Sequence, residues 1–368
     1  MIRLLHVADV HLGARFAGLG PRGAEQREQL RRTFARCVDV ALERGCHLVL
    51  VAGDLFDSPY PPRPLAAYAA EQLRRLVQAG VRVFVVAGNH DGAPDGVWRR
   101  EDFLRLVEGL VVFGDTPQAV SWEEAGVVVV GSSPTPGRSP LEGWHVPAGG
   151  LRVGLAHGSV YRPGQVEEAW AIRPEQVRAL GLDYLALGDW HSAQEVHPPP
   201  HAAWYAGAPE FLGLDQPGFG HVLVVEVSGP GQVQVEPVRV AKRRLVVETL
   251  DAGALDEGAL RTYLEQAADP DVVLDLTLAG VREPDRPWPL GALVREYADR
   301  FFRLHVRDRS HPRLDEDALE RFEPSTVLGQ FVRRMRERLA TCSAEEREEL
   351  EEALQLGVAA LQGREVLA

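Results

Sequence analysis

Short apolar runs alternate with amphipathic stretches along the first half of the chain. The runs are rich in Val, Leu and Ala, which is typical of strands buried on both faces of a sheet. The stretches at 25–44 and 64–79 repeat apolar residues with helical spacing and predict two helices. Strands that alternate with helices favour an α/β fold with helical crossovers. The apolar runs are residues 2–8, 47–53, 81–88, 126–131, 151–158 and 182–188.

Beyond about residue 110 the expected strands follow one another more closely, as antiparallel strands do. We expect antiparallel pairing for the segments at 111–114 and 126–132. The segments at 220–227 and 232–240 should form a hairpin around the sequence SGPGQ at 228–232. The pattern therefore predicts an α/β fold built as a mixed β-sandwich flanked by helices.

The later part of the chain changes pattern and predicts further domains. Residues 1–240 would form the α/β domain, and the basic stretch at 241–244 would be the junction after it. Residues 241–310 contain strand, helix, strand, helix and strand patterns, which predict a small α+β domain. Residues 311–368 predict C-terminal helices, which we interpret as a segment able to bind a partner.

Two local signals support the C-terminal helices. Val327, Phe331, Met335 and Leu339 lie on one stripe at helical spacing, either for a partner's groove or for packing on this chain's own core. Ser343 and Glu346 have the spacing of a capping box, which starts a helix.

Composition narrows the class of protein. The chain has 368 residues, of which 45% are hydrophobic and 25% charged, as in ordinary globular domains. No apolar run approaches the roughly 18 residues of a membrane span, and the N-terminus lacks a signal sequence. We therefore expect a cytoplasmic protein without membrane contact. Three scattered cysteines predict neither a disulfide framework nor a zinc knuckle.

The formal net charge of −13 counts against a polyanionic partner such as DNA. Bound cations can reverse the local sign of a carboxylate-rich site, however, so the total weakens a DNA hypothesis without excluding it.

Polar residues of metal-ligand type follow five of the expected strands. Carboxylate, imidazole and amide side chains suit hard or borderline divalent cations. In open α/β sheets, ligands gather at the carboxyl ends of strands, so residues far apart in sequence can converge there. The clusters are Asp9 and His11, then Asp54 and Asp57, then Asn89, His90 and Asp91, then His157, and finally Asp189 and His191.

Each cluster alone has a plainer explanation, because a turn aspartate commonly caps a helix and a lone histidine can be a core residue. The ordered set of five favours a metal site.

The series DxH, GDxxD, GNHD, H and GDxH closely resembles the signature motifs of the calcineurin-like metallophosphoesterases. More narrowly, HVADVHLG, GDLFD, GNHD and YAGAPE are similar to motifs of the SbcD-type DNA repair exonucleases, bacterial relatives of the double-strand-break repair nuclease. The resemblance implies a four-layer β-sandwich that carries two divalent metal ions. Mn²⁺ is the expected metal, with Mg²⁺, Fe²⁺ and Zn²⁺ left open.

The same resemblance implies a role for each matching residue. Asp9, His11, Asp54 and His191 would surround one metal. Asp54 would be shared with a second metal, which Asn89, His157 and Asp189 would also hold. His90 would be the general acid, with Asp57 or Asp91 orienting its ring, and Arg15 could contact substrate phosphates.

Asp189 departs from the family pattern, which has histidine at that place. A carboxylate could keep the second site with an altered metal preference, or leave it weaker.

Three functions remain open at this point. The first is a metal-dependent DNA exonuclease that acts in repair with an ABC-type coiled-coil ATPase, as a homodimer by resemblance. The second is a metallophosphoesterase that acts on nucleotides or other small phosphoesters. The third is a non-catalytic binding protein on a metallophosphoesterase fold, for which Asp189 would be a sign of decay.

Overall fold

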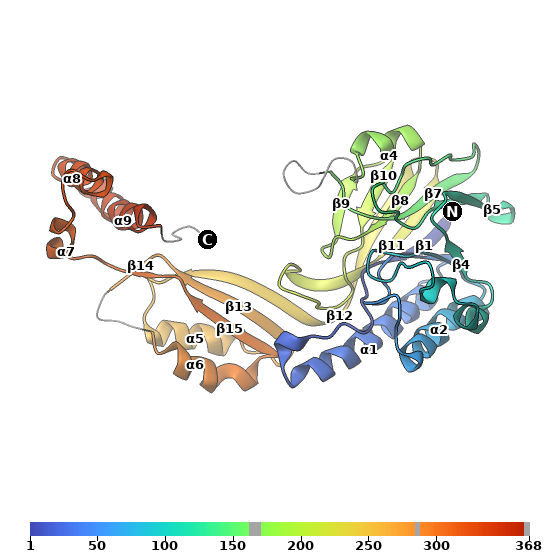
Figure 1. The fold of residues 1–368 in the computed structure, drawn as a ribbon, viewed down its shortest axis with the longest axis horizontal. Coiled ribbons are helices and arrows are strands. Elements are labelled where there is room, and N and C mark those ends of the chain that lie inside the picture. The colour runs from blue at the N-terminus through green and yellow to red at the C-terminus, as the bar shows by residue number, and fades with distance from the viewer. Residues whose placement is uncertain (162–170, 284–287, 364–368) are drawn as a thin grey trace. The chain divides into compact units, whose positions relative to one another are not determined.

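The computed structural model describes residues 1–161, 171–283 and 288–363 and divides the chain into two compact units (Figure 1). The first unit is Met1–Arg244 and the second is Leu245–Ala368. The division falls four residues after the predicted boundary of 240, and residues 241–244 lie inside a continuous strand, β12 (Gln232–Asp251), instead of a loop. Residues 311–368, which the sequence pattern set apart, belong to the second unit.

The first unit contains two sheets. The strands that the first unit contributes to the first sheet have the order β12-β11-β1-β2-β3-β4. Strands β1 to β4 run parallel, and β11 pairs with β1 in antiparallel register. Strands β11 and β12 are neighbours joined through Pro230 and Gly231, so the expected hairpin is present. The bounds are β1 Ile2–Val7, β2 Leu48–Ala52, β3 Arg82–Val86, β4 Val111–Phe113 and β11 Gly218–Gly229.

The second sheet has the order β5-β6-β7-β8-β10-β9. Its four central strands are parallel, and β5 and β9 are antiparallel edges. The bounds are β5 Gln118–Trp122, β6 Val127–Gly131, β7 Leu151–His157, β8 Tyr184–Gly188, β9 Gln194–His197 and β10 Ala202–Tyr205.

Three layers of buried side chains hold this unit together. One face of the first sheet packs on helices α1 (Arg22–Glu43) and α2 (Arg63–Gln78), through residues such as Phe34 and Leu73. Its other face packs on the second sheet, where Leu50 and Phe84 belong to the same cluster as Val129. The outer face of the second sheet is covered by Trp144 and by α4 (Pro174–Leu180). The result is a helix, sheet, sheet, helix sandwich, which confirms the predicted fold class.

The expected antiparallel pairing is wrong for the segment at 111–114, whereas the segment at 126–132 does pair antiparallel with β5. Strand β4 lies in the first sheet, parallel to β3, whereas β6 lies in the second sheet between β5 and β7. The physical reason is the connection before β4. The short helical segments η2 (Val97–Arg99), α3 (Glu101–Leu104) and η3 (Arg105–Val107) provide the crossover that parallel strands require.

The second unit begins with the end of β12 and continues as the sequence pattern predicts. Helices α5 (Glu257–Ala267) and α6 (Leu290–Tyr297) alternate with strands β13 (Val272–Ala279) and β15 (Arg303–Asp308), which are parallel. Leu260 and Leu293 of the helices share a core with Leu274 and Leu276 of β13. Strands β14 (Val281–Arg282) and β16 (His311–Pro312) form a small separate sheet.

Helices α7 (Glu316–Glu320), α8 (Val327–Leu339) and α9 (Ala344–Leu361) end the described chain. The predicted capping box starts α9, with the Glu346 amide donating to Ser343 Oγ at 3.2 Å. Phe331, Met335 and Leu339 pack against the core that α8 and α9 share, whereas Val327 is 73% exposed. Three of the four residues of the stripe therefore pack within this chain. Among the described residues, no helix is both long and apolar enough to cross a membrane.

Candidate metal centre

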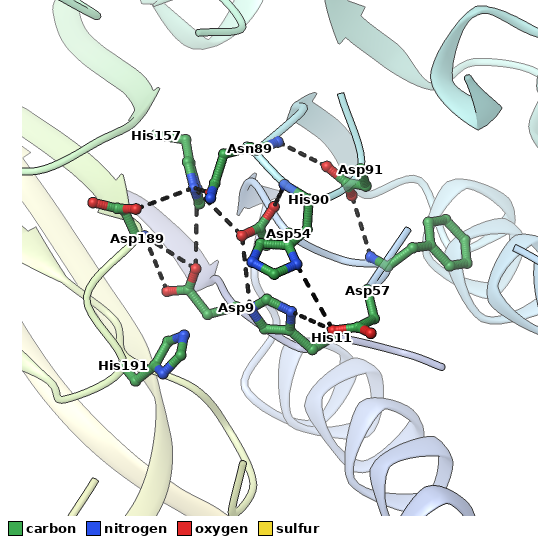
Figure 2. Close-up of polar contacts among 12 residues, drawn as sticks. Asp9, His11, Asp54, Asp57, Asn89, His90, Asp91, His157, Asp189 and His191 are labelled. Atoms are coloured by element: carbon green, nitrogen blue, oxygen red, sulfur yellow. Dashed lines mark hydrogen bonds and ion pairs between the residues drawn. The ribbon is translucent and has the colours of Figure 1, made fainter. Parts of the chain in front are cut away.

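The five predicted clusters converge at one end of the sandwich (Figure 2). Three of them follow β1, β2 and β3 of the first sheet, and two follow β7 and β8 of the second sheet. Because the strands within each set are parallel, their carboxyl ends lie at the same edge. The two sheets face each other, so loops far apart in sequence meet there: the amide of Asp189 donates to Oδ1 of Asp9, 180 residues earlier, at 3.0 Å.

The backbone at this edge is strained. Only five non-glycine residues of the described chain have positive φ, and four of them are predicted ligands. Asp9, His11 and Asp54 have φ of 52°, 50° and 51°, and Asp189 has φ of 100°. Such conformations cost on the order of 1–3 kcal/mol each and gather at functional sites. Strain at four of the predicted ligands favours a functional role for this edge.

Two glycines allow this close approach. A Cβ on Gly88 would lie 2.1 Å from Asp54 Oδ1, and one on Gly53 would lie 2.2 Å from His157 Nδ1. Any side chain at either position would displace a predicted ligand, which is why the GD and GN pairs of the motifs begin with glycine.

One group of potential ligand atoms consists of His11, Asp54 and His90, all within 4.8 Å of one another. His11 Nδ1 lies 3.2 Å from Asp57 Oδ1. If Nδ1 donates its proton to Asp57, the lone pair of Nε2 is available to coordinate a metal. That Nε2 is buried, has no hydrogen-bond partner, and lies 3.6 Å from Asp54 Oδ2. A buried imidazole nitrogen without a partner is what a cation site requires.

The second group consists of Asp9, Asp54 and His157, again within 4.8 Å. All three are almost fully buried. His157 Nδ1 donates to the carbonyl of Ala52 at 2.9 Å, and its Nε2 lies 3.5 Å from Asp54 Oδ2. The amide oxygen of Asn89 lies 2.8 Å from the same Nε2, and Asp189 Oδ1 lies 3.8 Å from it. Asp54 is common to both groups, as a residue bridging two metals would be.

His191 lies at the border of the first group. Its ring centre is 5.4 Å from that of His11, and its Nδ1 is 2.9 Å from Asp215 Oδ2. Asp215 therefore orients this ring, so that Nε2 is the nitrogen left for a metal.

The charges of the site favour a cation. Burial raises the pKa of Asp9 to about 7, so the metal-free pocket holds carboxylate charge poorly. Burial alone would lower the pKa of His157, but the charges of Asp54, Asp9 and Asp189 outweigh it and raise that pKa. Burial opposes the His11 shift too, yet the Asp57 hydrogen bond and the nearby carboxylates raise its pKa. A divalent cation would supply the positive charge that this cluster lacks, so the residues present fit the two metals that the motifs imply.

His90 differs from its neighbours because its side chain is 46% exposed. Its backbone amide donates to Asp54 Oδ1 at 2.9 Å, and its Nδ1 lies 3.8 Å from Asp57 Oδ1. The imidazole thus stands at the rim of the cluster, where a substrate can reach it.

Asp91 hydrogen-bonds to backbone amides, although the sequence suggested that it could orient the His90 ring. It is fully buried, and its carboxylate accepts hydrogen bonds from the amides of Gly88 and Phe56 at 2.7 and 3.2 Å. These bonds brace the loops that carry Asp54 and Asn89, and they leave Asp57 as the carboxylate beside the His90 ring. Neither aspartate caps a helix, since α2 begins at Arg63 and η2 at Val97.

Arg15 is exposed, and the contact that the structure gives it is its backbone carbonyl accepting from Arg27 at 2.8 Å. Its contact with substrate phosphate stays a prediction.

A cavity of about 1540 Å³ opens beside the second group. Asn89, His157 and Asp189 line it at the metal centre, and Leu104, Val112 and Arg138 line it further away. A substrate phosphate at the metals could therefore keep an organic substituent in this cavity.

Sequence reasoning missed three residues that support the ligands. Ser159 donates a hydrogen bond to Asp189 Oδ2, Asp215 holds His191, and the hydroxyl of Tyr205 donates to the Gly158 carbonyl at 2.8 Å. Ser159 follows His157 by two residues and could have been considered with it. Asp215 and Tyr205 carried no local signal of their contacts.

Comparison with known proteins agrees with the fold and the site. Residues 2–225 match the family profile described as calcineurin-like phosphoesterase. The chain therefore belongs to the calcineurin-like phosphoesterases, a family of hydrolases that use divalent metals.

Within this family, the chain is similar to proteins named for DNA repair, which confirms the resemblance found in its motifs. The DNA double-strand break repair protein Mre11 of Aeropyrum pernix is 30% identical over 327 residues, covering 80% of this chain and 76% of that protein. The protein of the same name from Sulfurisphaera tokodaii is 25% identical over 272 residues, covering 69% and 67%. An uncharacterized metallophosphoesterase of Bacillus subtilis, YhaO, is 24% identical and covers 62% and 58%.

Proposed function

We propose that the protein is a metal-dependent DNA exonuclease that acts in DNA repair. The observation that carries this proposal is the pair of ligand groups that share Asp54, with the accessible His90 at their rim. The similarity to Mre11 proteins supports DNA as the substrate. Mn²⁺ is the proposed metal by family resemblance, and the predicted carboxylate and amide oxygens are ligands that suit it.

Each residue has a distinct task in this proposal. Asp9, His11, Asp54 and His191 hold one metal, and Asp54, Asn89, His157 and Asp189 hold the other. When bound, two such cations would polarise the phosphodiester and activate a water.

The leaving oxygen then needs a proton, and His90 is placed at the rim to donate it. Asp57 Oδ1 lies 3.8 Å from His90 Nδ1 and would orient that ring. The cavity next to Asn89 would hold the nucleotide that retains the phosphate after the bond to the leaving oxygen is cut.

The partners belong to the same proposal. The family resemblance supports an ABC-type coiled-coil ATPase as a partner and a homodimer, and the protein would act in the cytoplasm. The exposed Val327 at the start of α8 is an apolar residue that a partner could cover. The small domain of the second unit would help to select DNA ends.

A second candidate is a metallophosphoesterase for nucleotides or other small phosphoesters. The cavity favours it, because its lining includes apolar side chains such as Leu104 and Val112 and it would enclose a small substrate.

One assay separates the candidates. Purified protein with Mn²⁺ is incubated with linear duplex DNA, single-stranded DNA and bis-p-nitrophenyl phosphate, beside the His90→Ala variant. We expect DNA cleavage by the wild type, and a loss of about 10²–10⁴-fold in kcat when the general acid is removed. Metal content should be unchanged in the variant.

The matched control is His145→Ala, which removes an exposed histidine outside the site and should leave cleavage unchanged. Cleavage of the small ester alone would replace the first proposal with the second. Loss of one metal from His90→Ala would make His90 a ligand instead of the acid, since its ring nitrogen also lies in the first group. No hydrolysis with any metal would contradict both.

A further inference from the structure

Asp189 occupies an unusual place in the second ligand group. Its amide donates to both oxygens of Asp9, at 3.0 and 3.2 Å, so its backbone is fixed beside that buried carboxylate. Its side chain is 25% exposed, and Oδ1 lies 3.8 Å from His157 Nε2 (Figure 2). One carboxylate oxygen of Asp189 therefore faces the other potential ligands.

Ser159 holds the other oxygen. Its hydroxyl donates to Asp189 Oδ2, which joins the loop after β7 to the loop after β8. The same two loops are joined by a backbone hydrogen bond from Gly158 to Gly188, at 3.1 Å. The carboxylate thus has one oxygen used by Ser159 and one left for a cation.

The Ser159 loop is itself fixed. Tyr205, which is 2% exposed, donates its hydroxyl proton to the carbonyl of Gly158 and accepts from the amide of Val160, both at 2.8 Å. Both residues that flank Ser159 are therefore held by one buried side chain. A hydroxyl on such a loop can set the direction of the Asp189 carboxylate before any metal binds.

We propose that Asp189, oriented by Ser159, is a ligand of the second metal and makes that site select Mn²⁺ or Mg²⁺ against Zn²⁺. An imidazole suits Zn²⁺, whereas carboxylate oxygen suits Mg²⁺ and Mn²⁺. With Asp189, the residues proposed for the second metal are two carboxylates, Asp54 and Asp189, with the amide oxygen of Asn89 and one imidazole, His157. This raises the negative charge and the hardness of the site together. The inference rests on the two-metal site of the proposed function; what it adds is the role of Ser159 and the metal selectivity, which do not depend on which phosphoester is hydrolysed.

The test measures metal binding directly. Chelator-stripped protein is dialysed against graded Mn²⁺ or Zn²⁺, and bound metal per chain is counted by mass spectrometry. The variants are Asp189→His, Asp189→Asn and Ser159→Ala, with Ser159→Thr as the variant that keeps the hydroxyl. The matched control is Ser121→Ala, an exposed serine of β5.

We expect two Mn²⁺ per wild-type chain. Asp189→His should raise the ratio of Zn²⁺ to Mn²⁺ affinity at the second site, and Asp189→Asn should weaken Mn²⁺ there. Ser159→Ala should weaken second-site Mn²⁺ binding by roughly 10–100-fold, as loss of a partner that orients a ligand does. Ser159→Thr and Ser121→Ala should bind as the wild type does.

Retained binding of Mn²⁺ at the first site shows that a variant is folded. A variant that keeps one Mn²⁺ at the His11 group and loses the other supports the proposal. An unchanged metal ratio in Asp189→His would overturn the selectivity, and unchanged Mn²⁺ binding in Asp189→Asn would overturn the ligand role. If Ser159→Ala binds both metals as tightly as the wild type, Ser159 has no positioning role.

Discussion

At the scale of single residues, Asp57 shows how one carboxylate serves two histidines. Its Oδ1 lies 3.2 Å from His11 Nδ1 and 3.8 Å from His90 Nδ1. The first contact fixes the ring of a predicted ligand, and the second places a negative charge beside the proposed acid. Both effects depend on the charge of one side chain that is 31% exposed.

Replacing Asp57 should therefore affect metal binding and catalysis together. We expect Asp57→Ala to lower both Mn²⁺ affinity and kcat by roughly 10–100-fold, and Asp57→Asn to lose less because the amide oxygen still accepts from His11. Equilibrium dialysis would measure the affinity, and assays at saturating Mn²⁺ would measure kcat. Wild-type metal affinity and wild-type kcat in Asp57→Ala would contradict this role.

At the scale of elements, Glu210 fixes the start of the strand segment that leads out of the first unit. This fully buried carboxylate accepts from Thr33 Oγ1 of α1 at 2.8 Å. It also accepts from the amides of Lys242 and Arg243 in β12, at 2.9 and 3.1 Å. One side chain of the YAGAPE motif thus joins a helix, a loop and a strand.

The Glu210→Gln variant tests this anchor. The NH₂ group of the glutamine would face a hydrogen-bond donor, so two buried donors would be left without an acceptor. We therefore expect the free energy of unfolding to fall by about 1–3 kcal/mol. Urea unfolding followed by circular dichroism would measure it. Glu236→Gln is the control, because Glu236 is 55% exposed where it pairs with Arg44 and should matter little. Equal stability of the two variants would show that Glu210 is not an anchor.

At the scale of the whole molecule, the metal centre joins the two sheets of the first unit. Its ligands come from the ends of strands in both sheets, and Asp54 belongs to both ligand groups. Bound cations would therefore hold together loops whose carboxylates repel one another without metal. Metal binding should be linked to the folding of this unit.

We expect Mn²⁺ to raise the thermal unfolding midpoint of the first unit and EDTA to remove the effect. One site filled at a hundredfold excess over its Kd would add about 2.7 kcal/mol. In Asp54→Asn most of this gain should disappear, because the variant alters both groups at once. If Mn²⁺ raises the unfolding midpoint of Asp54→Asn as much as that of the wild type, Asp54 is not shared by the two metals. Calorimetry with and without Mn²⁺ provides the measurement.

Much of the fold could be predicted from the sequence because its signals are local. The strands, the two long helices and the capping box at Ser343 each depend on residues close together in the chain. Strand β4 was expected to be antiparallel and is parallel to β3, because the direction of pairing depends on the path of a connection and not on the strand's own residues.

The candidate site likewise has a part that local signals predict and a part that they do not. The positions of the predicted ligands at the ends of strands could be read from the chain, since polar residues that end an apolar run are a local pattern; these residues are Asp9, His11, Asp54, Asn89, His157, Asp189 and His191. The contacts of Ser159 with Asp189, of Asp215 with His191 and of Asp91 with backbone amides became visible in the folded chain alone. These contacts depend on the close packing of separate loops at the end of the sandwich. Residue type and spacing cannot specify which neighbour a side chain meets there.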